Sequence, residues 1–293
     1  MVRLHGFLRL LLFLLLFALS TPLADIVVLK LAMDKNGFIG SLKPVSPPPS
    51  ITHPASDTPS NSNPSNFRFT SPASLDLVHR LRSHCDFLIT SSTTVTADNP
   101  SFTCRRGYDH KSLYNEDSPQ TGPTRVVLDR SLKTFQFNKT EPLQILTHRE
   151  PNDQLNDPPT IIYHAQDKAA PADQPSVSFR PLPAPCLPSS LHIIESLSNN
   201  VMIEGGGTLA ELFAPHVTHA ILITSPHEVF PTETAVDGHV SDRENLVKHG
   251  LRLVGTTDEE GDAVEYWKKS DHLIDKHFLE HPNGLLEFLL PVP

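Results

Sequence analysis

An acidic residue followed by three glycines is the feature of this sequence best suited to chemistry. The apolar residues 201–203 predict a short buried strand that ends at Glu204, and residues 205–207 are all glycine. Glycine allows positive φ angles and a close approach of the backbone to a bound group. Helical spacing resumes over residues 208–213. A strand, a glycine turn and a helix N-terminus can together seat an anion or a phosphate, although an ordinary structural turn explains the same residues.

Two further groups of polar residues lie within an expected strand or directly after one. Lys30 interrupts the β-branched apolar run 26–33, so it is either functional or extends to an edge of the sheet. Residues 91–94 form a hydroxyl-rich turn after the strand expected at 85–89, and Asp98 and Arg105 then lie in one short loop. An arginine there could bind phosphate, and Asp98 could equally cap the turn and pair with Arg105.

Composition limits the range of functions. The formal net charge of −9 argues against a nucleic-acid-binding surface, which needs basic residues to neutralise phosphates. The three cysteines show no Cys-x-x-Cys pair, so neither a disulfide framework nor a zinc site is indicated. The sixteen histidines provide no pair with a convincing third ligand. We therefore expect no metal, no nucleic acid and a small-molecule ligand.

One domain is expected, over residues 25–269. Residues 41–66 are rich in proline, serine and asparagine and are interpreted as a flexible insertion, and residues 270–293 as a tail that covers an edge or contacts a second copy in a homodimer. Residues 1–24 contain an apolar run at 7–18 that is typical of a signal peptide. The run is short for a membrane span and includes Arg9, so contact with a membrane is expected only through this leader if it is not cleaved.

The expected elements alternate between strands and helices and end in a hairpin. Ser71 and Pro72 predict a helix start, because serine caps a helix and proline suits its first position. Further helices are expected at 192–198 and 208–213. Strands are expected at 26–33, 85–89, 124–129, 143–147, 160–163, 177–179, 201–203 and 219–224, and the hairpin at 251–254 and 263–267. This pattern indicates an α/β three-layer domain with a mixed sheet.

The order of the motifs resembles that of the riboflavin-biosynthesis reductase family over roughly residues 25–267. The motifs are Leu-Lys-Leu-Ala-Met (29–33), Phe-Thr-Ser-Pro (69–72), His-Arg-Leu-Arg (79–82), Thr-Ala-Asp-Asn-Pro (96–100), Phe-Thr-Cys-Arg (102–105), Arg-Val-Val-Leu-Asp (125–129) and Glu-Gly-Gly-Gly-Thr-Leu (204–209). The zinc pattern of the deaminase domain that bacterial relatives often carry is absent from the sequence. The chain thus looks like a stand-alone reductase.

The resemblance implies a dihydrofolate-reductase-like three-layer fold with a mixed, mostly parallel central sheet and a C-terminal antiparallel hairpin. It also implies an NADPH-dependent oxidoreductase that reduces the ribosyl C1′ of a pyrimidine ribosylamine 5′-phosphate. By resemblance the catalytic residues are Lys30 and Glu204, and the substrate-binding residues are Thr70, Ser71, Asp98 and Arg105. The cofactor-binding positions are Ser91, Thr93, Thr94, Asp129, Gly205, Gly206 and Gly207.

Departures from the family pattern leave alternatives open. Relatives usually carry Gly-x-Gly-Thr where residues 91–94 are Ser-Ser-Thr-Thr, and a β-branched Thr93 tolerates positive φ poorly. A non-catalytic relative with a degraded cofactor loop is therefore one alternative, and a reductase of another small heterocycle is a second. Asn99 in place of a second aspartate resembles fungal members, which favours the 2,5-diamino substrate. The leader suggests secretory routing or membrane anchoring, whereas the family is usually cytosolic or plastidial.

Overall fold

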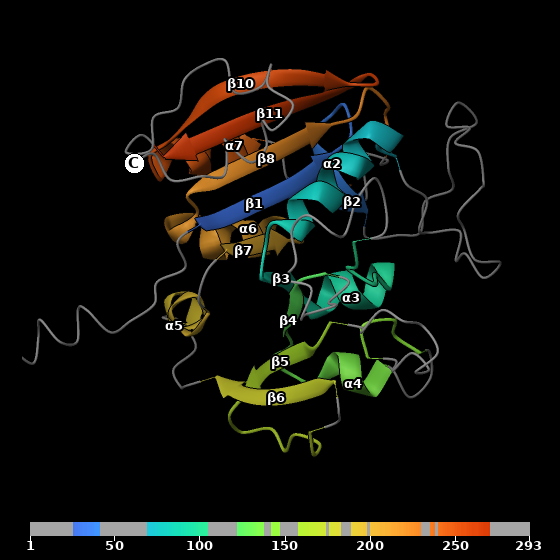
Figure 1. The fold of residues 1–293 in the computed structure, drawn as a ribbon, viewed down its shortest axis with the longest axis vertical. Coiled ribbons are helices and arrows are strands. Elements are labelled where there is room, and N and C mark those ends of the chain that lie inside the picture. The colour runs from blue at the N-terminus through green and yellow to red at the C-terminus, as the bar shows by residue number, and fades with distance from the viewer. Residues whose placement is uncertain are drawn as a thin grey trace, which may run out of the picture.

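Buried β-branched runs form the middle of a nine-stranded sheet in the computed structural model of the chain (Figure 1). The structure describes residues 26–41, 69–104, 122–137, 142–146, 158–173, 176–182, 189–197, 200–229, 235–237 and 240–269. The strands are β1 (Ile26–Met33), β2 (Phe38–Ser41), β3 (Phe87–Ser91), β4 (Thr124–Leu128), β5 (Thr160–Ala165), β6 (Val177–Leu182), β7 (Asn200–Glu204), β8 (His219–Thr224), β9 (Ala235–Asp237), β10 (Leu251–Glu259) and β11 (Asp262–Lys269).

The main sheet is mixed and mostly parallel. Its strand order is β10-β11-β8-β1-β7-β3-β4-β5-β6, and the strands from β8 to β6 run parallel to their neighbours. The C-terminal hairpin of β10 and β11 adds two antiparallel strands beside β8. A separate two-stranded sheet pairs β2 with β9. The expected fold class of a mostly parallel α/β sheet with a C-terminal antiparallel hairpin is confirmed.

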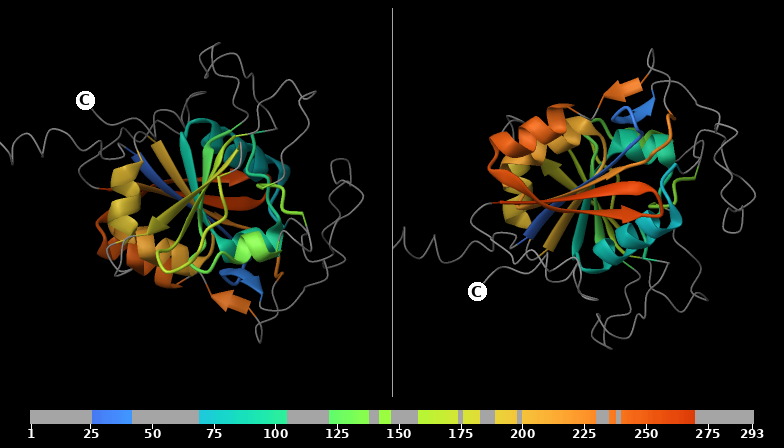
Figure 2. Two further views of the ribbon diagram at one scale, coloured as in Figure 1. Left: turned by 90° about the horizontal axis from the view of Figure 1, so that it is seen from below. Right: turned by 90° about the horizontal axis from the view of Figure 1, so that it is seen from above.

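Helices cover both faces of the sheet, so the domain has three layers (Figure 2). The helices are α2 (Pro72–Ser83), α3 (Ser92–Asp98), α4 (Lys133–Phe137), α5 (Ser189–Ser196), α6 (Gly207–Phe213) and α7 (Val240–Lys248), with the 3-10 turn η1 (Ala214–His216). One core contains side chains from α5, α6 and α7. The other core contains side chains from α2 and α3.

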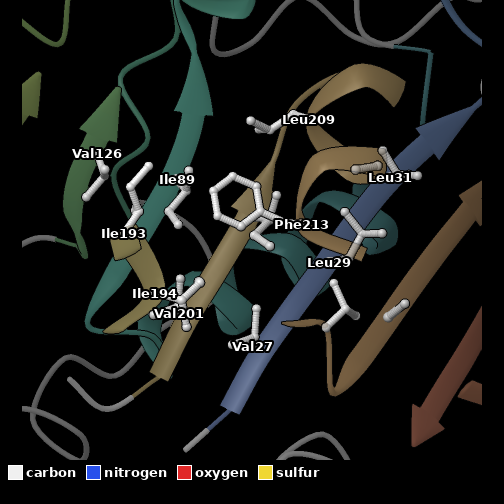
Figure 3. Close-up of a cluster of buried hydrophobic side chains, with 14 of the residues drawn as sticks. Val27, Leu29, Leu31, Ile89, Val126, Ile193, Ile194, Val201, Leu209 and Phe213 are labelled. Carbon is white, nitrogen blue, oxygen red and sulfur yellow. The ribbon is translucent and has the colours of Figure 1, made fainter. Parts of the chain in front are cut away.

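Alternation along the strands explains the two cores, because successive residues of a strand point to opposite faces. Val27, Leu29 and Leu31 of β1 face the α5, α6 and α7 side, where Phe213 fills the space above them (Figure 3). Val28 belongs to the core on the α2 and α3 side. Both faces of β1 are therefore buried, which is why its sequence reads as an almost unbroken apolar run.

Local signals place α2 where the sequence predicts it. The hydroxyl of Ser71 accepts a hydrogen bond from the backbone N–H of Ser74 at 3.0 Å, and Pro72 is the first helical residue. The structure differs at residues 91–94, because Ser91 is the last residue of β3 and α3 begins at Ser92 without an intervening turn. The strand expected at 143–147 is also wrong, because residues 144–146 form a turn.

Several expectations concern residues outside the described ranges. The leader (1–24), residues 42–66 of the insertion and the tail (270–293) are among them, so their interpretation stays a prediction. Within the described ranges, no helix is long and apolar enough to span a membrane. The short elements β2, β9, α4 and α7 were not expected from the sequence, since each combines a weak apolar pattern with few residues.

Candidate active site

Lys30 and Glu204 lie side by side on neighbouring strands. They are Cα partners in the parallel pair of β1 and β7, so their side chains project from the same face of the sheet. The Nζ atom of Lys30 lies 3.2 Å from Oε1 of Glu204. The two side chains are 13% and 12% exposed, so this ion pair is largely shielded from water. Strand pairing thus brings together two predicted catalytic residues that are 174 positions apart.

The ion pair lies near the carboxyl ends of β1 and β7, where the chain leaves the sheet in two directions. The segment after β1 leads to α2 on one face, and the segment after β7 leads directly to α6 on the other face. Such a change of direction opens a crevice beyond the strand ends, and ligands of open α/β sheets bind there. The topology therefore makes this edge of the sheet the candidate site.

Arg82 completes the cluster from helix α2. Its Nε donates to Oε2 of Glu204 at 3.0 Å, and its Nη2 donates to Oε1 at 2.9 Å. This two-point contact matches the planar guanidinium to the planar carboxylate and fixes the orientation of both groups. The sequence interpretation named Arg82 as part of a motif but did not place it in the site.

A signal for Arg82 is nevertheless present in the sequence. Leu77, Val78 and Leu81 form the buried face of α2, and Arg82 lies four residues after Val78 on that same face. An arginine among buried apolar positions of a helix needs an acidic partner, because a buried charge without one is costly. The sequence could therefore have indicated a buried partner for Arg82, but not which of the acidic residues it is.

Glu204 is ionised at all ordinary pH values. Burial by itself would raise the pKa of its carboxyl group, but Arg82 and then Lys30 outweigh burial through their charges and hydrogen bonds. The pKa falls from 4.5 to about 2. A carboxylate with so low a pKa does not donate a proton near neutral pH, so Glu204 acts as a fixed negative charge.

Asp98, at the end of α3, belongs to the same electrostatic cluster. Desolvation raises the pKa of its carboxyl group, Lys30 opposes that rise, and Glu204 adds to it. Asp98 is exposed by surface area, although neighbouring atoms partly desolvate its carboxyl group. Asp98 thus lies within electrostatic range of both Lys30 and Glu204, and its contact with a substrate stays a prediction.

The two predicted cofactor segments also meet. A Cβ atom built on Gly205 would lie 3.5 Å from Oγ1 of Thr94 and 2.8 Å from Cδ2 of Leu209. On Gly206, a Cβ atom would have only Ile39 within 4 Å among the described residues, at 3.8 Å. Gly205 is therefore needed for packing, whereas the backbone at Gly206 is open. The two segments thus meet at Gly205 and Thr94, and their part in binding a cofactor stays a prediction.

The three glycines do not use the positive φ angles that glycine allows. Residues 205–207 are absent from the described positions with positive φ, and Gly206 has a φ of −84° as the residue before α6. The same holds for Thr93, which lies in the first turn of α3. The hydroxyl of Ser91 caps that helix by accepting from the backbone N–H of Thr94 at 3.2 Å. Serine and threonine therefore fit this segment without backbone strain.

Ser71 and Thr70 lie at the carboxyl edge of the sheet beside the C-terminal hairpin. The backbone N–H of Ser71 donates to Oδ2 of Asp262 at 2.7 Å, and its hydroxyl donates to the carbonyl of Glu259 at 2.7 Å. Ser71 is 6% exposed, so its side chain is already used in joining α2 to the hairpin. Thr70 is half-buried next to it. Their contact with a substrate stays a prediction.

The carboxylate of Asp129 has a structural role. Its Oδ1 accepts from the backbone N–H of Lys133 at 2.8 Å, and its Oδ2 accepts from the backbone N–H of Thr134 at 2.7 Å and from the Thr134 hydroxyl. The residue is fully buried. Its carboxylate therefore caps α4, and the expected contact of Asp129 with a cofactor stays a prediction. Arg105 lies outside the described residues, so its predicted role in phosphate binding has no structural account.

Asn99 also has a structural task. It ends α3 in the left-handed region with a φ of 43°, a conformation that asparagine tolerates well. Its Nδ2 donates to the carbonyl of Pro142 at 3.1 Å, and its Oδ1 accepts from the backbone N–H of Gln144 at 2.8 Å. An aspartate could not donate the first of these bonds. The asparagine at this position is thus explained by local structure, and it no longer indicates which pyrimidine is the substrate.

Comparison with known proteins identifies the family. Residues 58–217, more than half of the chain, match the family described as the RibD C-terminal domain. The chain belongs to the RibD C-terminal domain family. The matched residues include Arg82, Asp98 and Glu204, while Lys30 on β1 precedes them. No curated protein matches the chain with significant sequence similarity.

Solved structures agree with this family at the level of the fold. The diaminohydroxyphosphoribosylaminopyrimidine deaminase/5-amino-6-(5-phosphoribosylamino)uracil reductase of Thermotoga maritima is 19% identical, with a TM-score of 0.50 over 86% of this chain and 58% of that one. RibD of Acinetobacter baumannii is 19% identical, with a TM-score of 0.51 over 86% of this chain and 60% of that one. A pyrimidine reductase-like protein of Corynebacterium diphtheriae is 16% identical, with a TM-score of 0.51 over 83% and 91%.

This chain therefore spans less than two thirds of the length of the first two structures. The dihydrofolate-reductase-like fold expected for the RibD C-terminal domain family is confirmed. Membership also agrees with the sequence resemblance to the riboflavin-biosynthesis reductases.

Proposed function

We propose that this chain is an NADPH-dependent reductase that converts a ribosylaminopyrimidine 5′-phosphate to its ribitylamino form. The observation that carries the proposal is the pair of Lys30 and Glu204, which stands at the carboxyl edge of β1 and β7 directly before the glycine turn of residues 205–207. Charged groups for the reacting sugar and open backbone for a nucleotide thus adjoin each other. Membership of the RibD C-terminal domain family supports the same activity.

The cofactor would be held by the surface that the two segments form together. The open backbone at Gly206 and the hydroxyl of Thr94 offer donors to phosphate groups. When bound, NADPH would supply a hydride to C1′ of the ribosyl group. Because Ser91 and Thr93 fit their backbone without strain, backbone strain does not support the alternative of a non-catalytic relative.

The reaction also needs a proton. Reduction at C1′ breaks the bond between C1′ and the ring oxygen, so that the electrons of this bond stay on the oxygen and take up a proton. Glu204 is ionised and cannot provide it. Lys30 carries three N–H groups, of which Glu204 accepts one, so its ammonium group can hydrogen-bond the ring oxygen and protonate it. Asp98 interacts electrostatically with Lys30 and with Glu204, so its charge acts on the same pair.

The test uses the full chain with NADPH and the ribosylaminopyrimidine 5′-phosphate, in its diamino and its deaminated form. We expect oxidation of NADPH with at least one of the two. Lys30→Met should lower the turnover number by roughly 100-fold or more. The matched control is Lys35→Met, which removes a half-exposed lysine of the turn after β1 and should change turnover by less than about twofold.

Failure to bind NADPH at millimolar concentration would refute the proposal. Equal activity of Lys30→Met and wild type would refute the role of Lys30 while leaving the reductase activity in place. Growth of a riboflavin auxotroph that expresses the chain is an independent measurement. We expect complementation by the wild type and by Lys35→Met, and none by Lys30→Met.

A further inference from the structure

Arg82 holds Glu204 by both of its oxygen atoms. Nε binds Oε2 and Nη2 binds Oε1, at 3.0 and 2.9 Å, while Lys30 reaches only Oε1 at 3.2 Å. The side chain of Arg82 is 11% exposed. A lysine can rotate about its flexible stem, but a guanidinium that contacts both oxygens leaves the carboxylate one orientation. Arg82 therefore fixes the position of Oε1 of Glu204, the oxygen atom that accepts the hydrogen bond from Lys30.

The surroundings of Arg82 fix the arginine in turn. Its guanidinium carbon lies 5.3 Å from the centre of the Phe102 ring, and Nη1 contacts the carbonyl of Thr103 at 3.5 Å. Phe102 is buried and has a φ of 51°, which is rare for a bulky side chain and carries a conformational penalty. The packing that maintains this backbone also keeps the ring against Arg82.

Gly122 supports the same segment from behind. A Cβ atom on Gly122 would lie 3.2 Å from the carbonyl oxygen of Phe102 and 3.3 Å from the Cα atom of Thr103. The backbone before β4 thus packs tightly against residues 102 and 103. A strained, tightly packed loop that presents one aromatic ring and one carbonyl to an arginine is what is needed to immobilise that arginine.

We propose that Arg82 is a positioning residue of the reductase, which keeps the Glu204 carboxylate charged and turned toward Lys30 so that the ammonium group of Lys30 faces the substrate. The proposal rests on the proposed function of the same site. Arg82 does not have to touch the substrate in this role. Its effect on the reaction passes through Glu204.

Three charged groups from different elements face Glu204. Arg82 comes from α2, Lys30 from β1 and Asp98 from α3. Arg82 is the stronger of the two cations acting on this carboxyl group. If Arg82 is replaced by an uncharged residue, burial is opposed by Lys30 alone, so the carboxyl group of Glu204 should take up protons much more readily.

The direct test follows the side-chain carboxyl carbon of Glu204 by NMR as the pH is changed, in full-length protein labelled with ¹³C-glutamate. The resonance is assigned by its loss in Glu204→Gln. We expect the proton affinity of Glu204 to rise roughly tenfold or more in Arg82→Met. The matched control is Arg243→Met, since Arg243 makes an equivalent two-point contact with Glu265 at 3.0 and 2.6 Å on the opposite face of the sheet. It should leave Glu204 unchanged.

A kinetic measurement separates a positioning role from a purely structural one. In Arg82→Met we expect turnover to fall by roughly tenfold or more. We also expect kcat to decrease at acidic pH, because Glu204 becomes protonated there. Arg82→Lys keeps the charge but not the two-point contact. In Arg82→Lys we expect kcat at acidic pH to show no additional loss, while the turnover number recovers only in part.

The outcomes distinguish this proposal from the reductase function itself. An unchanged titration of Glu204 in Arg82→Met would overturn the proposal, and so would full activity of that variant. If Arg82→Met does not fold, Arg82→Lys decides, because wild-type turnover in that variant would show that orientation by two contacts is not required. If the wild type does not oxidise NADPH, the reductase function fails, and so does the positioning role in it.

Discussion

The low pKa of Glu204 predicts a specific loss of stability in acid. The pKa of this carboxyl group is about 2 in the folded chain, against an ordinary value of 4.5 that holds in the unfolded chain. Because the folded value is the lower one, the contribution to stability is complete above pH 4.5 and is lost as the pH falls toward 2. One pKa unit corresponds to about 1.4 kcal/mol, so the whole shift is worth roughly 3 kcal/mol. Between pH 7 and pH 3, about 2 kcal/mol of it should disappear.

The measurement is the free energy of unfolding in urea at pH 7 and at pH 3, for the wild type and for Glu204→Gln. At pH 7 the glutamine leaves Arg82 and Lys30 without a negative partner, so the substitution should destabilise the chain by roughly 3 to 5 kcal/mol. At pH 3 the penalty should be smaller by about 2 kcal/mol, since the wild type has lost that increment. Glu211→Gln, which removes an exposed carboxylate of α6, is the matched control.

An equal penalty for Glu204→Gln at the two pH values would refute this reasoning. It would mean that Glu204 titrates with an ordinary pKa in the folded chain, and that Arg82 and Lys30 do not overcome the effect of burial. A difference of the same size in Glu211→Gln would show instead that the general charge of the chain, and not this cluster, causes the acid sensitivity.

Three further predictions concern single positions. Gly206→Ala should change the free energy of unfolding by at most about 1 kcal/mol yet weaken NADPH binding, measured by calorimetry, roughly tenfold. Gly205→Ala should weaken binding and also lower stability by about 1 to 3 kcal/mol, because its Cβ would be 2.8 Å from the buried side chain of Leu209. Asn99→Asp should cost about 1 kcal/mol in urea unfolding by losing its bond to Pro142, with the preference between the two pyrimidines unchanged in the NADPH assay. Asp129→Ala should lower stability by roughly 2 kcal/mol while the measured NADPH affinity stays the same, because its carboxylate caps α4.

Local signals were sufficient for most of the fold. The limits of β1 and β8 match the predicted runs at 26–33 and 219–224, because continuous apolar stretches of β-branched residues are buried on both faces of a parallel sheet. The start of α2 follows from Ser71 and Pro72, whose preferences are set by backbone hydrogen bonds within one turn. By contrast, residues 144–146 of the apolar run at 143–147 form a turn, since periodicity in five residues does not tell a strand from a buried loop.

Within the site, the sequence indicated which residues carry charge in apolar surroundings. It did not indicate which residues contact each other. Glu204 and Lys30 stand out in the sequence because each places a charge at or near an apolar run. The structural tasks of Asp129 and Asn99 were hidden, since their hydrogen bonds run to backbone groups whose positions depend on how the following segments fold back. Arg82 was overlooked for the same reason, because its partner is 122 residues away.

The sequence by itself determined most of the buried strands, the start of α2 and the order of motifs that indicates the family, because these depend on neighbouring residues. Only the tertiary structure decided that β7 lies between β1 and β3, that its register sets Glu204 beside Lys30, and that α2 brings Arg82 to the same carboxylate. The physical reason is that strand order and register minimise the free energy of the whole packed sheet, to which contacts between distant residues contribute as much as local preferences do.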